Sequence, residues 1–261
     1  MNDTSKSRDY LISISAVILF LVVWQLAATA GVINRNILAS PFDLAILGAQ
    51  QVVDGTIFRH TLVSLSRVIS GFTIGAVLAI ILGLAMGNSE RFRIIINPIV
   101  EVLRPIPPLA WIPLAIIWFG IGETSKIFLI ALTSFFPIVV NTFKGVTGLD
   151  RTLLRAARSF DVTPRKMLWQ VALPAAMPDI STGLRVGWSL ALAVLVAAEM
   201  IAAKSGLGFL ITEAMNLGRF DMVVFGIVVI GIVSVATDAL LRAFIGRYLL
   251  FWHRGLDSAG G

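Results

Sequence analysis

The amino-acid sequence predicts an all-α membrane protein in which about six transmembrane helices form a single domain over residues 1–261. Hydrophobic residues make up 57% of the chain and charged residues only 14%, whereas an ordinary soluble domain carries about 25% charged residues. Several apolar segments reach the roughly 20 residues that a helix needs to cross about 30 Å of hydrocarbon. The chain has no cysteine. These observations exclude soluble globular domains, disordered chains and disulfide-stabilised secreted scaffolds.

The first span is expected within residues 10–34, which carry no charge and contain an apolar run over residues 11–26. Ala28 and Ala30 resemble the small-residue cleavage site of a signal peptide. The apolar run is longer than the roughly 7–15 residues typical of such a peptide. We therefore expect a transmembrane helix that is retained.

Five further spans are expected on hydropathy. They are residues 68–89, without charge; residues 105–122, broken by Pro107, Pro108 and Pro113; residues 127–143, with Pro137; residues 183–203, with Arg185 and Glu199; and residues 222–241, with Asp238.

The basic residues predict the orientation of these spans. Six spans place both termini on one side of the membrane. If that side is the cytoplasm, most of the 21 Lys and Arg residues fall in cytoplasmic segments. The outer segments then carry only Arg35, Arg59, Lys126, Lys204 and Arg219. Because cytoplasmic loops are enriched in Lys and Arg, we expect both termini to be cytoplasmic.

One long cytoplasmic segment, residues 144–181, is the least hydrophobic part of the chain. Its apolar spacing predicts two short amphipathic helices. Thr163 followed by Pro164 is a favourable start for the second helix. We expect Pro174 to end that helix before the fifth span.

This segment contains a sequence motif, RAARSFDVTPRKMLWQVALP, over residues 155–174. It resembles the EAA loop of permeases from ATP-binding-cassette (ABC) importers. Ala156, Ala157, Leu173 and Pro174 match that signature, and Val171 stands for its Ile. The sequence departs from the signature in two places, with Arg155 at the Glu position and Asp161 at the Gly position. An Asp adopts the turn conformations of a Gly at some cost.

The resemblance extends over roughly residues 62–252 and is strongest in residues 101–130 and 196–211. These stretches are similar to the taurine, alkanesulfonate and nitrate permeases. The resemblance implies a type I importer fold and a multi-pass protein of the bacterial inner membrane. It also implies four kinds of partner: a second permease copy, two copies of an ABC ATPase, a periplasmic or lipid-anchored solute-binding protein, and membrane lipid. No nucleic-acid partner is expected.

In such an assembly the motif docks on the ATPase. Small side chains permit close approach of helices, an aromatic residue anchors in an apolar notch, and proline stiffens the corner. The candidate coupling residues are Arg155, Ala156, Ala157, Phe160, Asp161, Pro164, Val171, Leu173 and Pro174. The alternative interpretation is a plain amphipathic cytoplasmic loop.

The sequence predicts no catalytic, cofactor or metal site on this chain. It has no GxxxxGK[ST] phosphate-binding loop, and its two histidines, His60 and His253, are too far apart for an HExxH site. We therefore expect a transport subunit and not an enzyme. ATP and Mg²⁺ would bind to the separate ATPase chain.

The candidate pore residues are Arg104, Pro107, Pro108, Trp111 and Glu199. Unwound backbone at membrane depth is tolerated where it is buried or lines a water-filled path, so the prolines indicate a pore-lining bend. The alternative is a static kink, with Arg104 and Arg185 reaching the cytoplasmic interface. We also expect Glu199 to brace the outer end of the fifth span through Lys204 or a backbone donor.

Three GxxxG pairs, Gly71 with Gly75, Gly83 with Gly87 and Gly183 with Gly187, could bring helices close together within or between subunits.

The predicted function is ATP-driven import of a small organic anion by alternating access, with taurine and similar sulfonates as first choice. Within the same class, nitrate, bicarbonate, an aromatic carboxylate or a thiamine-precursor pyrimidine remain alternatives. A different class, the secondary transporters driven by ion gradients, would favour inverted repeats and a midplane acidic relay. The chain has no visible repeat, and only Glu199 and Asp238 are candidates for such a relay.

Overall fold

The computed structural model describes residues 3–32, 38–150, 152, 159, 163 and 166–250, without the side chains of residues 3–11, 13 and 14. This part of the chain is helical and contains no strand, which confirms the predicted all-α class. The elements are α1 (Asp3–Thr29), α2 (Pro41–Val53), α3 (Thr56–Asn88), α4 (Glu90–Leu103), η1 (Pro108–Trp111), α5 (Ile112–Phe119), α6 (Glu123–Thr147), η2 (Met167–Ala172), α9 (Leu173–Ala202), α10 (Leu207–Asn216), α11 (Phe220–Phe244) and η3 (Ile245–Leu249).

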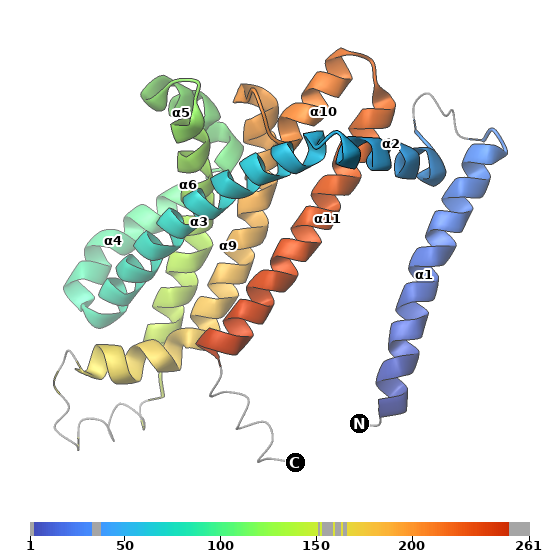
Figure 1. Ribbon diagram of the computed structural model, residues 1–261. Helices are drawn as coiled ribbons and strands as arrows, with labels where there is room; N and C mark the ends of the chain where they lie inside the picture. The colour runs from blue at the N-terminus through green and yellow to red at the C-terminus, as the bar shows by residue number, and fades with distance from the viewer. Residues whose placement is uncertain are drawn as a thin grey trace.

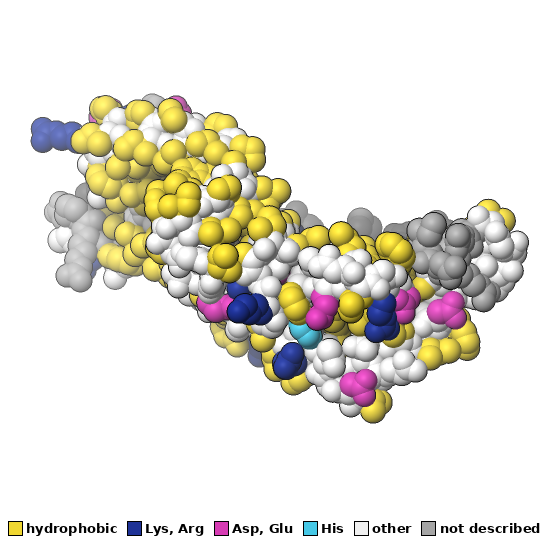
Figure 2. All heavy atoms as spheres, turned by 90° about the horizontal axis from the view of Figure 1, so that it is seen from above, with side chains coloured by type: hydrophobic (Ala, Val, Ile, Leu, Met, Phe, Trp, Pro, Cys, Tyr) yellow, Lys and Arg dark blue, Asp and Glu magenta, His cyan; other side chains and the backbone are white. Residues whose placement is uncertain are grey.

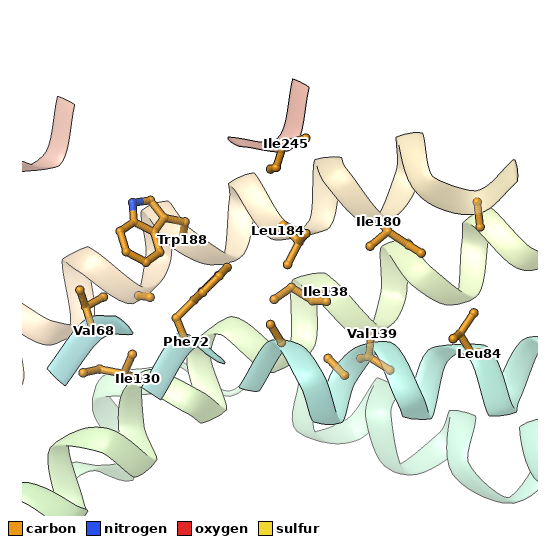
Figure 3. Packing of buried hydrophobic residues seen from close by; sticks show 14 of the residues in the cluster. Val68, Phe72, Leu84, Ile130, Ile138, Val139, Ile180, Leu184, Trp188 and Ile245 are labelled. Carbon is orange, nitrogen blue, oxygen red and sulfur yellow. The ribbon is translucent and has the colours of Figure 1, made fainter. Parts of the chain in front are cut away.

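The core of the fold is a three-helix layer in which α6 packs between α3 and α9 (Figure 1). Phe72 of α3 meets the Trp188 ring of α9 edge-on, with ring centroids 5.0 Å apart. Ile130 and Ile138 of α6 fill the space between the two outer helices and are fully buried (Figure 3). Buried apolar contacts therefore fix α6 as the central helix.

Glycines of α3 and α9 allow the backbones of these two helices to pack closely against α6. A Cβ atom built on Gly75 would lie 2.4 Å from the carbonyl oxygen of Ala131, and one on Gly187 would lie 3.1 Å from the carbonyl oxygen of Ser134. The other glycines of the three GxxxG pairs also face α6 side chains or backbone. Small residues are the usual means of close helix packing in membranes. All three predicted pairs thus act within this chain.

Four helical segments are long and apolar enough to cross a membrane: Thr56–Asn88, Glu123–Thr147, Met167–Ala202 and Phe220–Leu249. They contain the expected second, fourth, fifth and sixth spans. The fifth begins well before the expected residue 183, because Pro178 is accommodated inside α9. The expected first span falls in α1, whose described apolar part is Ser15–Thr29.

The break expected in the third span is present, but the bent helix pair begins at Glu90 and not within residues 105–122. Helix α4 ends at Leu103, η1 begins at Pro108, and the segments Glu90–Leu103 and Pro108–Phe119 meet at an angle of 93°. Helix α5 has only 8 residues, or about 12 Å of helix, which cannot cross a bilayer alone. Prolines lack an N–H group and crowd the preceding turn, so they convert this span into a broken pair.

The prediction that Pro174 ends a helix is wrong. The π-helical turn η2 runs directly into α9, and Pro174 lies in the first turn of that helix. The amide of Leu173 donates to the carbonyl of Leu168, the i→i−5 bond of a π-turn. This wider turn accommodates the proline ring. Since α6 continues to Thr147 and η2 starts at Met167, the connection between them is shorter than residues 144–181.

The remaining helices surround this core. Helix α2 lies across the upper end of the bundle, and α1 stands apart from it (Figure 1). Ser40 and Asp43 form a reciprocal capping box, which together with Pro41 fixes the start of α2. Leu19, Phe20 and most of their neighbours on α1 are exposed. An apolar exterior of this kind suits a lipid or protein environment.

Candidate functional site

The Pro-rich turn borders a cavity of about 340 Å³ between η1, α6 and α9. The chain turns sharply because Pro107 is extended, with φ −56° and ψ 132°, and Pro108 starts η1. The lining residues are Arg104, Ile106, Pro108, Trp111, Leu132, Thr133, Phe136, Pro137, Val140, Asn141 and Leu190. The unwound backbone therefore faces a hollow instead of a packed helix face.

Three polar groups converge on this cavity. Arg104 follows α4 with an exposed side chain and makes no ion pair with any described residue. The Asn141 amide donates to the carbonyl of Pro137 at 2.7 Å, which leaves its side-chain oxygen as an acceptor. Pro137 has no N–H group, so the carbonyl of Thr133 lacks its usual helical donor. The cavity thus combines one cation with hydrogen-bonding groups on mainly apolar walls.

The structure brings together three of the five candidate pore residues. Arg104, Pro108 and Trp111 line the cavity. Pro107 precedes η1 and shapes the turn. Glu199 does not line this cavity. It lies in a buried cluster near the C-terminal end of α9, and only 1% of its surface is exposed.

That buried cluster is centred on Arg67 of α3. Its Nη1 lies 2.7 Å from Oε1 of Glu199, and its Nε and Nη2 lie 2.5 Å and 2.7 Å from the two carboxylate oxygens of Glu123. Lys126 adds a 3.0 Å contact to Glu123. The three buried charges, Arg67, Lys126 and Glu199, are thus balanced with the help of Glu123, whose side chain is 58% exposed. Ser205 also accepts through its carbonyl from Arg67 at 2.6 Å.

Glu199 also holds the start of α10. Its carboxylate accepts from the Ser64 hydroxyl at 2.8 Å and from the amide of Gly208 at 2.9 Å. Gly206 has φ +119°, and a Cβ there would lie 2.4 Å from the Glu199 carboxylate, so only glycine fits. His60 Nδ1 lies 3.0 Å from the Gly206 amide. The cluster joins α3, α6, α9 and α10 at the end of the bundle shown in Figure 2, where acidic and basic side chains lie side by side.

The expectation for Glu199 was met in part. A backbone donor, the amide of Gly208, does brace it. Arg67 takes the place expected for Lys204, whose side chain is exposed. Sequence reasoning missed Arg67 as a partner, although an arginine beside an apolar span signals a need for a counter-charge.

Most candidate coupling residues lie outside the described residues: Arg155, Ala156, Ala157, Phe160, Asp161 and Pro164. Val171, Leu173 and Pro174 lie in η2 and the first turn of α9, and all three are half-buried. Trp169 of η2 is 55% exposed. The described end of the coupling segment is therefore directly continuous with a candidate membrane span.

The chain is similar to several permease proteins of known transport systems. It is 41% identical over 252 residues to the taurine transport system permease protein TauC of Escherichia coli strain K12, and the aligned residues cover 95% of this chain and 91% of the relative. It is 34% identical to SsuC of Bacillus subtilis strain 168, a permease assigned to aliphatic sulfonate transport, over 91% of this chain and 86% of the relative. It is 31% identical to the bicarbonate transport system permease protein CmpB of Synechococcus elongatus, over 94% and 91% of the two chains.

The fold has a solved counterpart in the MetNI methionine ABC transporter in an inward-facing conformation. The TM-score is 0.56 at 18% identity, covering 69% of this chain and 92% of the other. This likeness supports the type I importer permease fold. A family model described as "Binding-protein-dependent transport system inner membrane component" matches residues 71–249. The chain is therefore a multi-pass membrane protein that belongs to the family of binding-protein-dependent transport system inner membrane components.

Proposed function

We propose that this chain is the membrane-spanning permease subunit of a bacterial ABC importer for a small organic anion, with taurine-like sulfonates as first choice. Relatives named for taurine, aliphatic sulfonate and bicarbonate transport support an oxyanion substrate. The single observation that carries the proposal is the cavity of about 340 Å³ at the Pro-rich turn, with Arg104 at its edge.

The cavity suits an anion that passes through without being held. A cation in a low-dielectric passage lowers the free energy of a nearby anion. Arg104 is the one charged residue among the cavity-lining residues, and Trp111 and Phe136 make its walls largely apolar. Such a site binds weakly and selects little. In this scheme a solute-binding protein selects the substrate.

In this proposal the energy for transport comes from ATP hydrolysis by another chain. ATP and Mg²⁺ bind to a separate ABC ATPase, present in two copies, and two permease chains pair to form the pore. ATP binding closes the ATPase dimer, the docked coupling segments around Ala157 move together, and the pore opens toward the loaded binding protein. Hydrolysis then resets the assembly. This chain supplies the path and no chemistry of its own.

We infer that the end of the bundle carrying η2 faces the cytoplasm of a bacterial inner membrane. The start of α1, the end of α11 and η2 all lie at this lower end (Figure 1). Lys144, Lys166 and Arg247 lie near it. An excess of basic residues is typical of the cytoplasmic side.

Reconstitution of the full transporter tests the proposal. The chain is assembled with its ATPase and binding protein in proteoliposomes, and ATP-driven uptake of labelled taurine is measured against competing methanesulfonate, bicarbonate and nitrate. We expect uptake of taurine that methanesulfonate inhibits. Uptake of bicarbonate with no uptake of either sulfonate would replace the substrate class, as the bicarbonate relative suggests. Uptake driven by an ion gradient without ATP would refute the importer class.

A further inference from the structure

A second hollow with charged walls lies on the other side of α9, between α9 and α11. Six residues line its charged part, about 370 Å³ in volume: Thr182, Arg185, Val186, Ser189, Asp238 and Arg242. A neighbouring hollow of about 330 Å³ shares Ser189 and Asp238, so the two are continuous. We call them together the α9–α11 groove; its two helices run side by side in Figure 1.

The groove lies near the middle of the bundle's depth. Gly187 packs on the carbonyl of Ser134, and Ser134 lies at the centre of the 25-residue helix α6. Arg185 is two residues from Gly187, or about 3 Å along the helix axis. If α6 crosses the bilayer, the backbone of Arg185 is therefore close to the midplane. Hydrocarbon cannot solvate charged side chains at that depth, so water, protein or a ligand must contact them.

The charges in the groove do not cancel. The Asp238 carboxylate accepts from Nε of Arg242 at 2.7 Å and is held by that guanidinium. Arg185 has an exposed side chain and makes no ion pair with any residue that the structure describes. With one acid paired to one base, the groove keeps one uncompensated positive charge. Ser189 beside it offers a hydroxyl whose hydrogen is donated to the Arg185 carbonyl at 3.2 Å, which leaves an oxygen lone pair.

The groove and the cavity at the Pro-rich turn are neighbours on one helix. Ser189 lines the groove, and the next residue, Leu190, lines the cavity. Arg104 therefore lines one of two hollows that border α9 at consecutive residues, and Arg185 lines the other. Intramembrane charges that face an aqueous cavity commonly mark the route of a charged substrate.

We propose that the α9–α11 groove is part of the translocation path and that Arg185 is a second residue that contacts the transported anion. This inference rests on the proposed function. The ligand class is a singly charged oxyanion, a sulfonate or carboxylate, which a guanidinium binds with two parallel hydrogen bonds. Because Asp238 already forms an ion pair with Arg242, the groove offers no free carboxylate to the ammonium group of an aminosulfonate. Loss of Arg185 should then impair transport of taurine and of methanesulfonate equally.

The absence of cysteine from the chain allows a direct test. In the assembled transporter, Ser189→Cys reports on the groove. Val77→Cys is the matched control, because Val77 is 50% exposed on the apolar face of α3 and lies two residues from Gly75, which packs on the same Ser134. Rates of modification are measured with an anionic and a cationic methanethiosulfonate reagent, neither of which enters hydrocarbon.

We expect Ser189→Cys to react with both reagents, taurine to slow the reaction, and Val77→Cys to react with neither. Adding Arg185→Gln should lower the ratio of anionic to cationic reaction rates roughly tenfold, the effect of one nearby charge in a partly aqueous site. Arg185→Lys should keep most of that ratio. In uptake assays Arg185→Gln should slow taurine and methanesulfonate by the same factor.

Failure of this inference differs from failure of the proposed function. If the unmodified transporter takes up neither sulfonate, the proposed function fails whatever the reagents show. If it takes up taurine while Ser189→Cys is unreactive in every state, the groove is closed by lipid, by a second copy of the chain or by other protein, and the inference is wrong. A reaction ratio that does not change in Arg185→Gln would also overturn it.

Discussion

Arg67 and Glu199 form a buried ion pair across 132 residues of sequence, with 2.7 Å between Nη1 and Oε1. Their side chains are 3% and 0% exposed. The pair connects α3 with α9, and the Glu199 carboxylate also accepts a hydrogen bond from the amide of Gly208 in α10. One ion pair therefore holds three helices together at the end opposite η2.

We predict that Arg67→Met destabilises the chain by about 3–5 kcal/mol. Removing one member of a buried pair leaves the other charge uncompensated. Here Glu199 and Glu123 would both lose their main cation, with only Lys126 remaining near Glu123. The measurement is unfolding of the purified chain in detergent, followed by helical circular dichroism.

Lys204→Met provides the control for that change. Lys204 lies at the same end of the bundle with an exposed side chain and makes no ion pair with the described residues. Its loss should change the free energy of unfolding by no more than about 0.5 kcal/mol. Adding Glu199→Gln to Arg67→Met should recover part of the lost stability. Equal effects of Arg67→Met and Lys204→Met would contradict the cluster.

Gly75→Ala should destabilise the core by about 1–3 kcal/mol, because a Cβ at Gly75 would lie 2.4 Å from the Ala131 carbonyl oxygen and force α3 away from α6. Gly231→Ala in α11 is the matched control, since nothing lies within 4 Å of a Cβ there. It should be neutral or stabilising by up to about 1 kcal/mol through helix propensity. The free energy of unfolding of both variants is measured under identical conditions. An unchanged value for Gly75→Ala would show that α6 can shift to accommodate the added Cβ.

Hydropathy was sufficient to predict the all-α class and the helices that contain the second, fourth, fifth and sixth spans, because long apolar runs have few other structures in a membrane. At residues 105–122 hydropathy was insufficient alone, because it counts apolar residues but not backbone hydrogen bonds; the prolines predicted the break, although the bent pair begins earlier, at Glu90. The prediction at Pro174 was wrong because a π-turn accommodates a proline that would otherwise end a helix.

Of the candidate pore residues, the structure brings into one cavity only residues that are close in sequence. Arg104, Pro108 and Trp111 lie close in sequence and line one cavity. The partnership of Arg67 with Glu199 depends on how α3 and α9 pack through α6, which local sequence patterns do not encode. Long-range charge pairs of this kind need the fold before they can be assigned.

We predict that the isolated chain binds no ATP. It has no GxxxxGK[ST] loop, and the family to which it belongs comprises inner membrane components of transport systems. Equilibrium dialysis of the detergent-purified chain with labelled ATP at millimolar concentration should give only background binding. Saturable binding to the chain alone would refute the assignment of ATP to a separate subunit.

Ala157→Glu should uncouple transport while leaving the membrane helices intact. A bulky acid in place of a small residue would block close approach of the coupling segment to the ATPase. Copurification of the ATPase and taurine uptake should both fall, with unchanged detergent unfolding. Thr152→Glu places the same charge on an exposed residue of this segment that is not a candidate contact, and it should keep most activity. Full uptake and copurification in Ala157→Glu would rule out docking at this motif.

Arg104 provides the last prediction, because its exposed side chain borders the cavity at the Pro-rich turn. Arg104→Ala should slow uptake of taurine without loss of assembly, since the passage would lose the cation that lowers the free energy of an anion within it. Arg104→Lys should retain much of the rate, because weak transient contact needs a point charge and not a fixed bidentate geometry.

Cysteine substitutions over residues 104–118 locate the path itself, since the native chain has no thiol. Positions that line the cavity, such as Trp111, should react with water-soluble reagents in at least one state of the ATPase cycle. Ile112 and Ala115 are buried and should stay unreactive. A pattern in which every position is inaccessible in all states would make the 93° bend a structural kink and Arg104 an anchor at the membrane interface. Reactivity confined to the cavity-lining positions would instead place the substrate's route along the broken span, where unwound backbone has polar groups that water or an anion can contact.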